Sequence, residues 1–212
     1  MGANCGCHNT QFDGMDGRYK RALIAVILIN AIMFFVEMPL GFVGHSQAMK
    51  ADALDFLGDT ITYAMSLAVI GHHLHVRSKA ALIKGISLLL MGLWVLGSTI
   101  YAVFVLHTPA AGIMGTVGAT ALAANLTSVF LLMRYKDGDA NVRSVWLCSR
   151  NDAIGNLMVM LAASGVWATK TGWPDLIIAF VMASLFVYGA FSIIRQARAE
   201  LKHQNHHHAA AE

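Results

Sequence analysis

The chain has 212 residues, of which 57% are hydrophobic and only 13% are charged, and its formal net charge is +3. Soluble domains carry about twice this share of charged residues, so the composition excludes an ordinary soluble domain, and we expect no nucleic-acid partner. Long apolar runs separated by short polar clusters are typical of a protein that spans a lipid bilayer, and the length fits one membrane domain.

The first stretch, residues 1–19, is polar and rich in glycine. It lacks the basic and apolar regions of a cleavable signal peptide, so we expect a cytoplasmic N-terminal tail. Six apolar runs follow, each close to the ~20 residues that cross a bilayer core. The predicted spans are residues 21–44, 50–74, 80–106, 112–135, 143–169 and 174–195. They predict an all-α integral membrane protein with a six-helix transmembrane domain over residues 20–197, followed by a short His-rich cytoplasmic tail over residues 198–212.

The basic residues predict the orientation of these spans. Twelve of the fifteen lysines and arginines lie on one side of the membrane if the chain crosses it six times. They precede the first span, follow the sixth, or flank the connections between spans two and three and between spans four and five. Cytoplasmic connections carry an excess of Lys and Arg, so both termini are predicted to be cytoplasmic. Lys50 and Lys170 lie on the opposite side, and Arg150 lies within span five.

The second span carries three aspartates, although ionisable side chains in hydrocarbon cost roughly 2.5–3.5 kcal/mol each on insertion scales. Asp55 and Asp59 are four residues apart, so they lie on one face of a helix. Two neighbouring carboxylates repel each other when both are ionised, which favours a shared proton or a bound cation. Asp52 lies nearer the outer end, where a place at the helix start or a hydrogen bond to a neighbouring helix is expected, with metal ligation as the alternative.

The fifth span presents Cys148, Asp152 and Asn156 at successive four-residue spacings, again on one helix face. Counting the helical rise places Asp59 ~13 Å below the outer boundary of the bilayer core, and Asp152 ~13 Å above the inner one. Both depths are near the middle of a ~30 Å core. Two antiparallel helices can therefore bring Asp55, Asp59 and Asp152 around one point.

Three carboxylates without a basic partner at the same depth describe a site for a divalent cation. Arg150 is the only candidate counter-charge, and it points away from Asp152 on the helix. Ligation by Cys148 favours Zn²⁺ or Cd²⁺, whereas an all-oxygen set with Asn156 suits Mn²⁺ or Co²⁺. Two alternatives remain: Cys148 as a small buried apolar residue, and the aspartates as a network of helix–helix hydrogen bonds. The predicted metal ligands are Asp55, Asp59, Cys148, Asp152 and Asn156.

At these residues the chain resembles the cation diffusion facilitator family. Residues 51–59 are similar to the helix-two motif of that family in its Asp-xxx-Asp form. Residues 148–156 are similar to the helix-five motif, with Cys148 where His or Asp is usual. Weaker similarities are found at Asn30 and Glu37 in helix one and at residues 173–175 where helix six begins. The resemblance covers about residues 18–197.

The resemblance implies a divalent metal efflux transporter, not an enzyme, that works as a metal/proton antiporter and forms a homodimer. It implies a multi-pass membrane location, and the bacterial inner membrane is expected. No prosthetic group is expected; the cargo is expected to be Zn²⁺, with Cd²⁺, Co²⁺ and Mn²⁺ as alternatives. The family usually adds a cytoplasmic metal-binding domain of ferredoxin-like fold after helix six, whereas only residues 196–212 follow that helix here.

Two other functions also fit a metal site inside the membrane. One is a membrane metalloenzyme whose metal activates water, although no histidine lies near the aspartates in spans two and five. The other is a sensor or scaffold with a structural metal. The roles of the remaining metal-binding residue types stay open, including whether the C-terminal histidines are native or an added affinity tag: Cys5, Cys7, His8, His72, His73, His75, His203 and His206 to His208.

Overall fold

The computed structural model describes residues 16–68, 74–105, 108–136 and 140–209, with side chains described except at 74–78, 80, 140–148 and 199–209. Its helices are α1 (Gly17–Val43), α2 (Gln47–Ala68), α3 (Leu74–Val105), α4 (Ala111–Leu132), α5 (Ala140–Thr169) and α6 (Trp173–Ala209), with the short 3₁₀ helix η1 (Met133–Tyr135) after α4. The described ranges contain no strand. The predicted all-α fold with six long helices is therefore confirmed.

The largest differences from the predicted spans are in α2, α3 and α6: α2 ends at Ala68, and Leu74, the predicted last residue of the second span, begins α3. Helix α3 begins at Leu74 instead of residue 80, and α6 continues to Ala209, into the predicted tail. Hydropathy detects only the apolar part of a helix, whereas backbone hydrogen bonding continues into flanking polar residues. As a result, Lys84 lies within α3, ten residues after its first residue.

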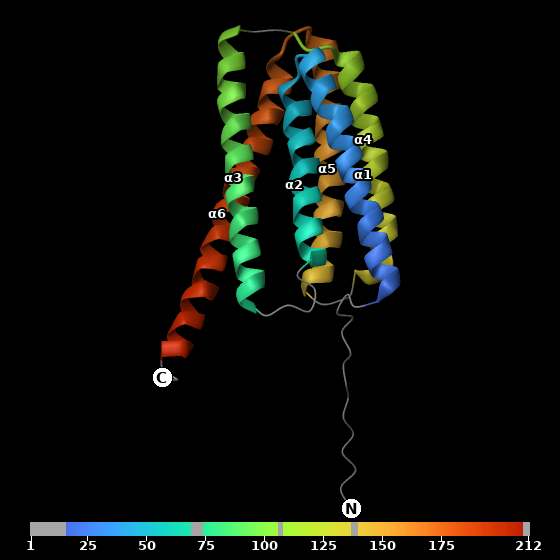
Figure 1. Cartoon of the computed structure of the whole chain (residues 1–212). Helices are drawn as coiled ribbons and strands as arrows, with labels where there is room; N and C mark the ends of the chain where they lie inside the picture. The colour runs from blue at the N-terminus through green and yellow to red at the C-terminus, as the bar shows by residue number, and fades with distance from the viewer. Residues whose placement is uncertain (1–15, 69–73, 106–107, 137–139, 210–212) are drawn as a thin grey trace, which may run out of the picture.

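Helices α2 and α5 occupy the centre of the bundle (Figure 1). Helix α1 packs against α2, α4 packs against α5, and α3 packs against α6; α2 and α5 also contact each other and both contact α6. The start of α1 and the end of α6 lie at the same end of the bundle (Figure 1). A chain that crosses the membrane an even number of times has both termini on the same side. That this side is the cytoplasm stays a prediction.

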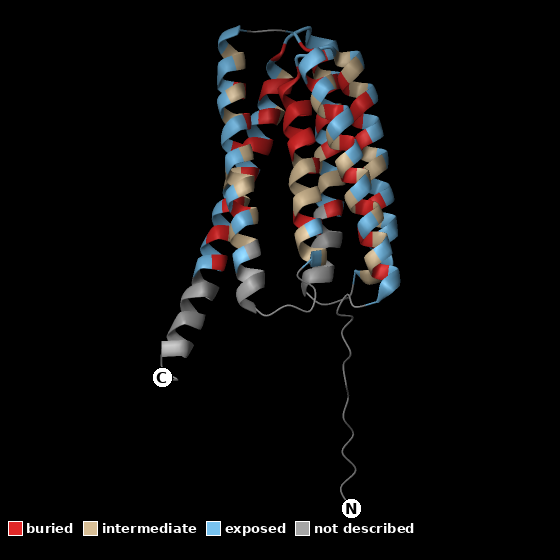
Figure 2. Cartoon of the chain, viewed as in Figure 1, coloured by how far each residue is buried: buried red, intermediate tan, exposed pale blue. Residues whose placement is uncertain are grey.

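Four of the described helical stretches are long and apolar enough to cross a membrane by themselves: Gly17–Val43, Ala81–Val105, Ala111–Tyr135 and Trp173–Arg198. Helices α2 and α5 are not among them, because polar and charged residues interrupt their apolar sequence. These are the two central helices, where polar side chains can face protein instead of lipid. The surrounding helices expose large apolar side chains such as Phe35, Phe104 and Phe130, and exposed positions follow their outer faces (Figure 2). The outer helices therefore present an apolar surface to the lipid chains.

Asp175 on the first turn of α6 fixes the start of α2. Its carboxylate accepts hydrogen bonds from the backbone N–H of Gln47 (2.7 Å) and of Ala48 (3.1 Å), and from the hydroxyl of Ser46 (2.5 Å). A carboxylate at a helix N-terminus satisfies N–H groups that lack an intrahelical partner and stabilises the helix dipole. Since α2 carries the aspartates, this contact sets their position relative to α6.

Candidate metal site

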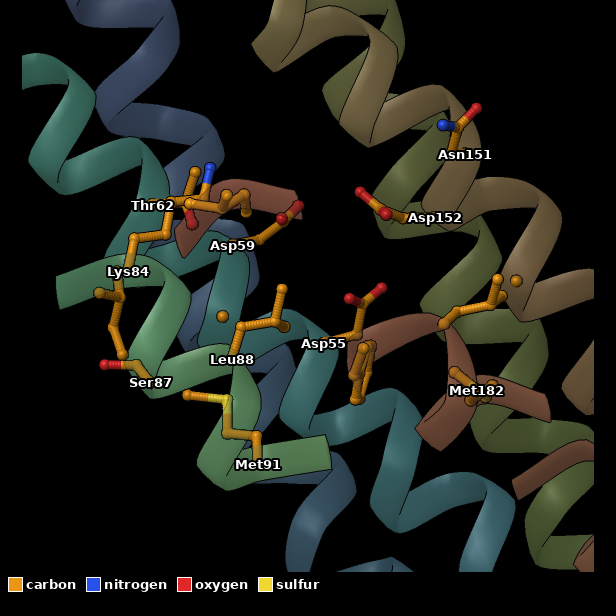
Figure 3. A pocket seen from close by; sticks show the side chains of 16 residues that line it. Asp55, Asp59, Thr62, Lys84, Ser87, Leu88, Met91, Asn151, Asp152 and Met182 are labelled. Carbon is orange, nitrogen blue, oxygen red and sulfur yellow. The ribbon is translucent and has the colours of Figure 1, made fainter. Parts of the chain in front are cut away.

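A cavity of about 360 Å³ lies between α2, α3, α5 and α6 (Figure 3). Each of the four helices contributes part of its wall, and acidic, basic, hydroxyl and apolar side chains all take part. The lining residues are Asp55, Gly58, Asp59, Ile61, Thr62, Lys84, Ser87, Leu88, Met91, Asn151, Asp152, Gly155, Met182, Leu185, Phe186 and Ile193. The cavity is therefore large enough for a hydrated or partly hydrated ion.

Three of the predicted ligands meet in this cavity. Asp55 and Asp59 project from successive turns of α2, and their carboxyl groups point toward that of Asp152 on α5 (Figure 3). Asp152 lies within hydrogen-bonding reach of both Asp55 and Asp59. A hydrogen bond between two carboxyl groups requires a proton on one of them, because an ionised carboxylate can only accept. The arrangement is thus suited to hold protons in the absence of a cation.

The three carboxyl groups do not form a closed ligand sphere. Within the described part of the chain, no group of three His, Cys, Asp or Glu side chains lies close enough to hold a metal ion. Carboxylate oxygens bind Zn²⁺ at about 2.0–2.2 Å, so the aspartates would have to move toward an ion to bind it together. The geometry therefore supports a shared cavity and leaves ligation by these residues a prediction.

The other two predicted ligands are placed differently. The backbone of Cys148 belongs to α5, one turn before Asp152, while its side chain lies outside the description. Asn156 is one turn beyond Asp152, is fully buried, and has no hydrogen-bond partner for either polar atom of its amide among the described residues. It does not line the cavity. An unsatisfied amide away from water is costly, so Asn156 has both polar atoms available for a ligand or a water molecule.

The expectation that the aspartates lack a basic partner at their depth is wrong. Lys84 on α3 lines the cavity with them, and its positive charge acts on Asp59. Because α3 begins at Leu74, Lys84 lies ten residues along it, or about 15 Å from its start. The sequence instead predicts Lys84 beside the connection between spans two and three, among the basic residues on the cytoplasmic side. Arg150, which the sequence predicts to point away from Asp152, is exposed and donates to the side-chain oxygen of Asn151 at 3.3 Å.

A second acidic pair lies beside the cavity, between α1 and α2. The carboxyl groups of Glu37 and Asp52 interact with each other, and both side chains are almost completely buried. Neither oxygen of Glu37 has a hydrogen-bond donor among the described residues. Asp52 therefore faces a neighbouring helix, one of its two expected roles. The sequence contained a signal for this pair: Glu37 and Asp52 lie at nearly equal distances from the tight connection at Gly44 to Ser46.

Comparison with known proteins adds information about the whole bundle. Residues 23–201 match the family described as cation efflux transmembrane domain. This range includes α2 to α5 completely, most of α1 and α6, and every residue of the cavity. The match therefore covers the part of the chain in which the candidate site lies.

Individual relatives are more distant. The cadmium, cobalt and zinc/H(+)-K(+) antiporter of Bacillus velezensis is 25% identical over 206 residues, which are 90% of this chain and 64% of the relative. The antiporter of the same name from Bacillus subtilis is 25% identical over 197 residues (86% and 63%). The zinc transporter ZitB of Escherichia coli is 24% identical over 197 residues (85% and 62%). The chain thus spans less than two thirds of the length of these relatives.

Proposed function

This chain belongs to the cation efflux family, and from that premise we propose that it exports divalent metal cations from the cytoplasm in exchange for protons. Its family is one of transporters, so the metalloenzyme alternative is not retained. The chain is a multi-pass membrane protein. We propose that it functions in the bacterial inner membrane as a homodimer and that its six-helix domain covers residues 20–197.

One observation carries the proposal: carboxyl groups from two central helices face a single cavity inside the bundle (Figure 3). Acidic side chains within a membrane are expensive and are found where they hold an ion, a proton or a partner. Asp55, Asp59 and Asp152 supply hard oxygen ligands, and hydrogen bonds among them need protons. The same three groups are therefore suited to bind a cation and protons in alternation.

The choice of metal rests on the chemistry of the candidate ligands and on the names of the relatives. Two relatives are named for cadmium, cobalt and zinc and one for zinc. A thiolate from Cys148 beside Asp152 would favour Zn²⁺ and Cd²⁺, because sulfur ligands select softer metals. The amide oxygen of Asn156 would favour Co²⁺ or Mn²⁺ in the same position. We propose Zn²⁺ as the principal cargo, with Cd²⁺, Co²⁺ and Mn²⁺ as further candidates.

The exchange of metal for protons is possible because either a metal ion or protons can neutralise the carboxylates of the cavity. Metal ligands must be deprotonated, so a metal ion that binds the aspartates releases the protons they share. When the metal leaves, protons return to the carboxyl groups and lower the cost of keeping them in the bundle. Transport then requires the cavity to open toward each side in turn around a fixed site. The α3–α6 pair, which packs mainly against itself, is the element that we propose moves against α2 and α5.

The test is transport by purified protein in liposomes with a pH-sensitive dye inside. Asp59→Asn and Asp152→Asn keep the size of each side chain but remove its negative charge. We expect both variants to lose Zn²⁺-driven proton flux by about a hundredfold or more, since one lost charge inside a low-dielectric site costs several kcal/mol of metal binding. Asp16→Asn, at an exposed position at the start of α1, is the matched control and should transport normally.

Two outcomes would contradict the proposal. Wild-type-like flux in both cavity variants would remove the aspartates from the transport site. Metal binding by the wild-type protein without any flux, in liposomes that hold a pH gradient, would favour the alternative of a sensor with a structural metal.

A further inference from the structure

The aspartate cavity contains a fixed positive charge whose role the metal site does not explain. Among the described residues that line the cavity, Lys84 is the only basic one, and the acidic ones are Asp55, Asp59 and Asp152. Lys84 comes from α3, whereas the aspartates come from α2 and α5, so it enters the lining of the cavity from a different helix (Figure 3). Its charge acts on Asp59 directly. A lysine here is unfavourable for binding any cation.

The net charge of the cavity suggests what Lys84 does. With three ionised carboxylates and one ammonium group, the cavity carries two negative charges. A single divalent cation neutralises it, whereas a monovalent cation leaves a net charge inside the bundle. Net charge in a low-dielectric interior is costly. Without Lys84 the cavity would keep one negative charge after binding a divalent ion, and it would hold that ion more tightly.

We infer that Lys84 limits the affinity of the cavity for divalent cations and thereby allows the bound ion to leave. The inference rests on the proposed function, because it describes the same site. A transporter has to bind its ion strongly enough to load it and weakly enough to release it. The three carboxylates provide strong binding, and the ammonium group of Lys84 on a different helix weakens it enough for release. Since Lys84 belongs to α3, movement of the α3–α6 pair changes its distance from the aspartates and thus the affinity.

The inference predicts that removing the charge strengthens binding and slows transport. Lys84→Leu replaces the ammonium group with a side chain that cannot bind metal, and Lys84→Arg keeps the positive charge. We expect Lys84→Leu to bind Zn²⁺ and Co²⁺ about tenfold tighter than the wild type, or more. Its transport should saturate at lower metal concentration and reach a lower maximal rate, because release limits the cycle. Lys84→Arg should resemble the wild type in both respects.

Binding is measured by isothermal titration calorimetry on the purified full chain in detergent, and transport in liposomes. The C-terminal sequence contains several histidines, a residue type that ligates Zn²⁺, so site binding is taken as the part that Asp59→Asn abolishes. Lys79→Leu is the matched control: Lys79 is an exposed lysine on the same helix, outside the cavity, and its loss should leave affinity unchanged. Lys84→Ala is the second neutral variant if Lys84→Leu does not purify as a single species.

The results separate this inference from the proposed function. If Asp59→Asn removes metal binding and the neutral Lys84 variants bind no tighter than the wild type, the role of Lys84 is overturned and the metal site stands. If Asp59→Asn leaves all metal binding intact, the metal site and the role of Lys84 both fail. Tighter binding by the neutral variants, restored to the wild-type value by Lys84→Arg, supports the inference.

Discussion

Glu37 and Asp52 are the residues whose burial is hardest to explain by packing alone. Both are almost completely removed from solvent, and the carboxyl oxygens of Glu37 have no donor among the described side chains. Two adjacent carboxyl groups become tolerable in a membrane interior when they share a proton, since one group then donates to the other. The pair lies next to Asp55, so its charge state also affects the cavity.

A pair of substitutions tests whether Glu37 acts as a hydrogen-bond partner. Glu37→Gln keeps the shape of the side chain and adds an N–H donor for Asp52, so we expect a melting temperature close to that of the wild type. Glu37→Leu leaves the buried carboxyl group of Asp52 without a partner and should cost about 1–3 kcal/mol of stability. Thermal unfolding in detergent, followed by tryptophan fluorescence, distinguishes the two. Equal destabilisation by both variants would show that the pairing does not stabilise the fold.

At the scale of helices, the bundle combines two kinds of packing. Side chains of α2 are buried from Gln47 to Leu54 and half-buried at Asp55 and Asp59, where the cavity begins. Packing is thus tightest at the end of the bundle where Asp175 caps α2. Helices α3 and α6 approach each other closely through small residues: a Cβ atom on Gly85 would lie 2.7 Å from Ile194 Cγ1. Close backbone approach of this kind holds transmembrane helices together.

Gly85 provides a test of the α3–α6 contact. We expect Gly85→Ala to destabilise the protein by about 1–3 kcal/mol, because the added methyl group overlaps Ile194 on α6. Gly97→Ala on the same helix is the control: nothing lies within 4 Å of its new Cβ atom, and alanine favours a helix over glycine by up to about 1 kcal/mol. Melting temperatures in detergent should therefore fall for Gly85→Ala and stay level or rise for Gly97→Ala. A loss of stability only in Gly97→Ala would contradict this account of the contact.

At the scale of the whole molecule, the distribution of polarity follows the position of each helix. The outer helices α1, α3, α4 and α6 contain apolar stretches long enough to span a bilayer, and the central helices α2 and α5 carry the aspartates of the cavity. The start of α1 and the end of α6 share one end of the bundle (Figure 1). The excess of lysine and arginine near that end predicts that it faces the cytoplasm.

Single introduced cysteines test this orientation in intact cells. With Cys5, Cys7 and Cys148 replaced by serine, Lys170→Cys and Arg198→Cys place one thiol at exposed positions near opposite ends of the bundle. A membrane-impermeant maleimide should label Lys170→Cys in intact cells and Arg198→Cys only after permeabilisation. The reverse labelling pattern would show that the protein has the opposite orientation in the membrane. The proposed export would then be import.

Much of this fold follows from local sequence. Apolar runs of about 20 residues require helices in a bilayer, because every backbone polar group must be satisfied within its own segment. Spacing of four residues places Asp55 and Asp59 on one face of α2, and Asp152 and Asn156 on one face of α5, whatever the packing. The sequence by itself therefore determined six helices, the residues on each polar face, and the family of the chain.

Only the tertiary structure decided which polar faces meet. Periodicity assigns a residue to a face of its own helix and carries no information about the neighbouring helix. The sequence therefore predicts Lys84 beside a cytoplasmic connection, although α3 brings it to the cavity. The pairing of Glu37 with Asp52 and the capping of α2 by Asp175 likewise depend on contacts between helices. These contacts arise because buried charged groups need partners, and the packing of the bundle determines which partners are near.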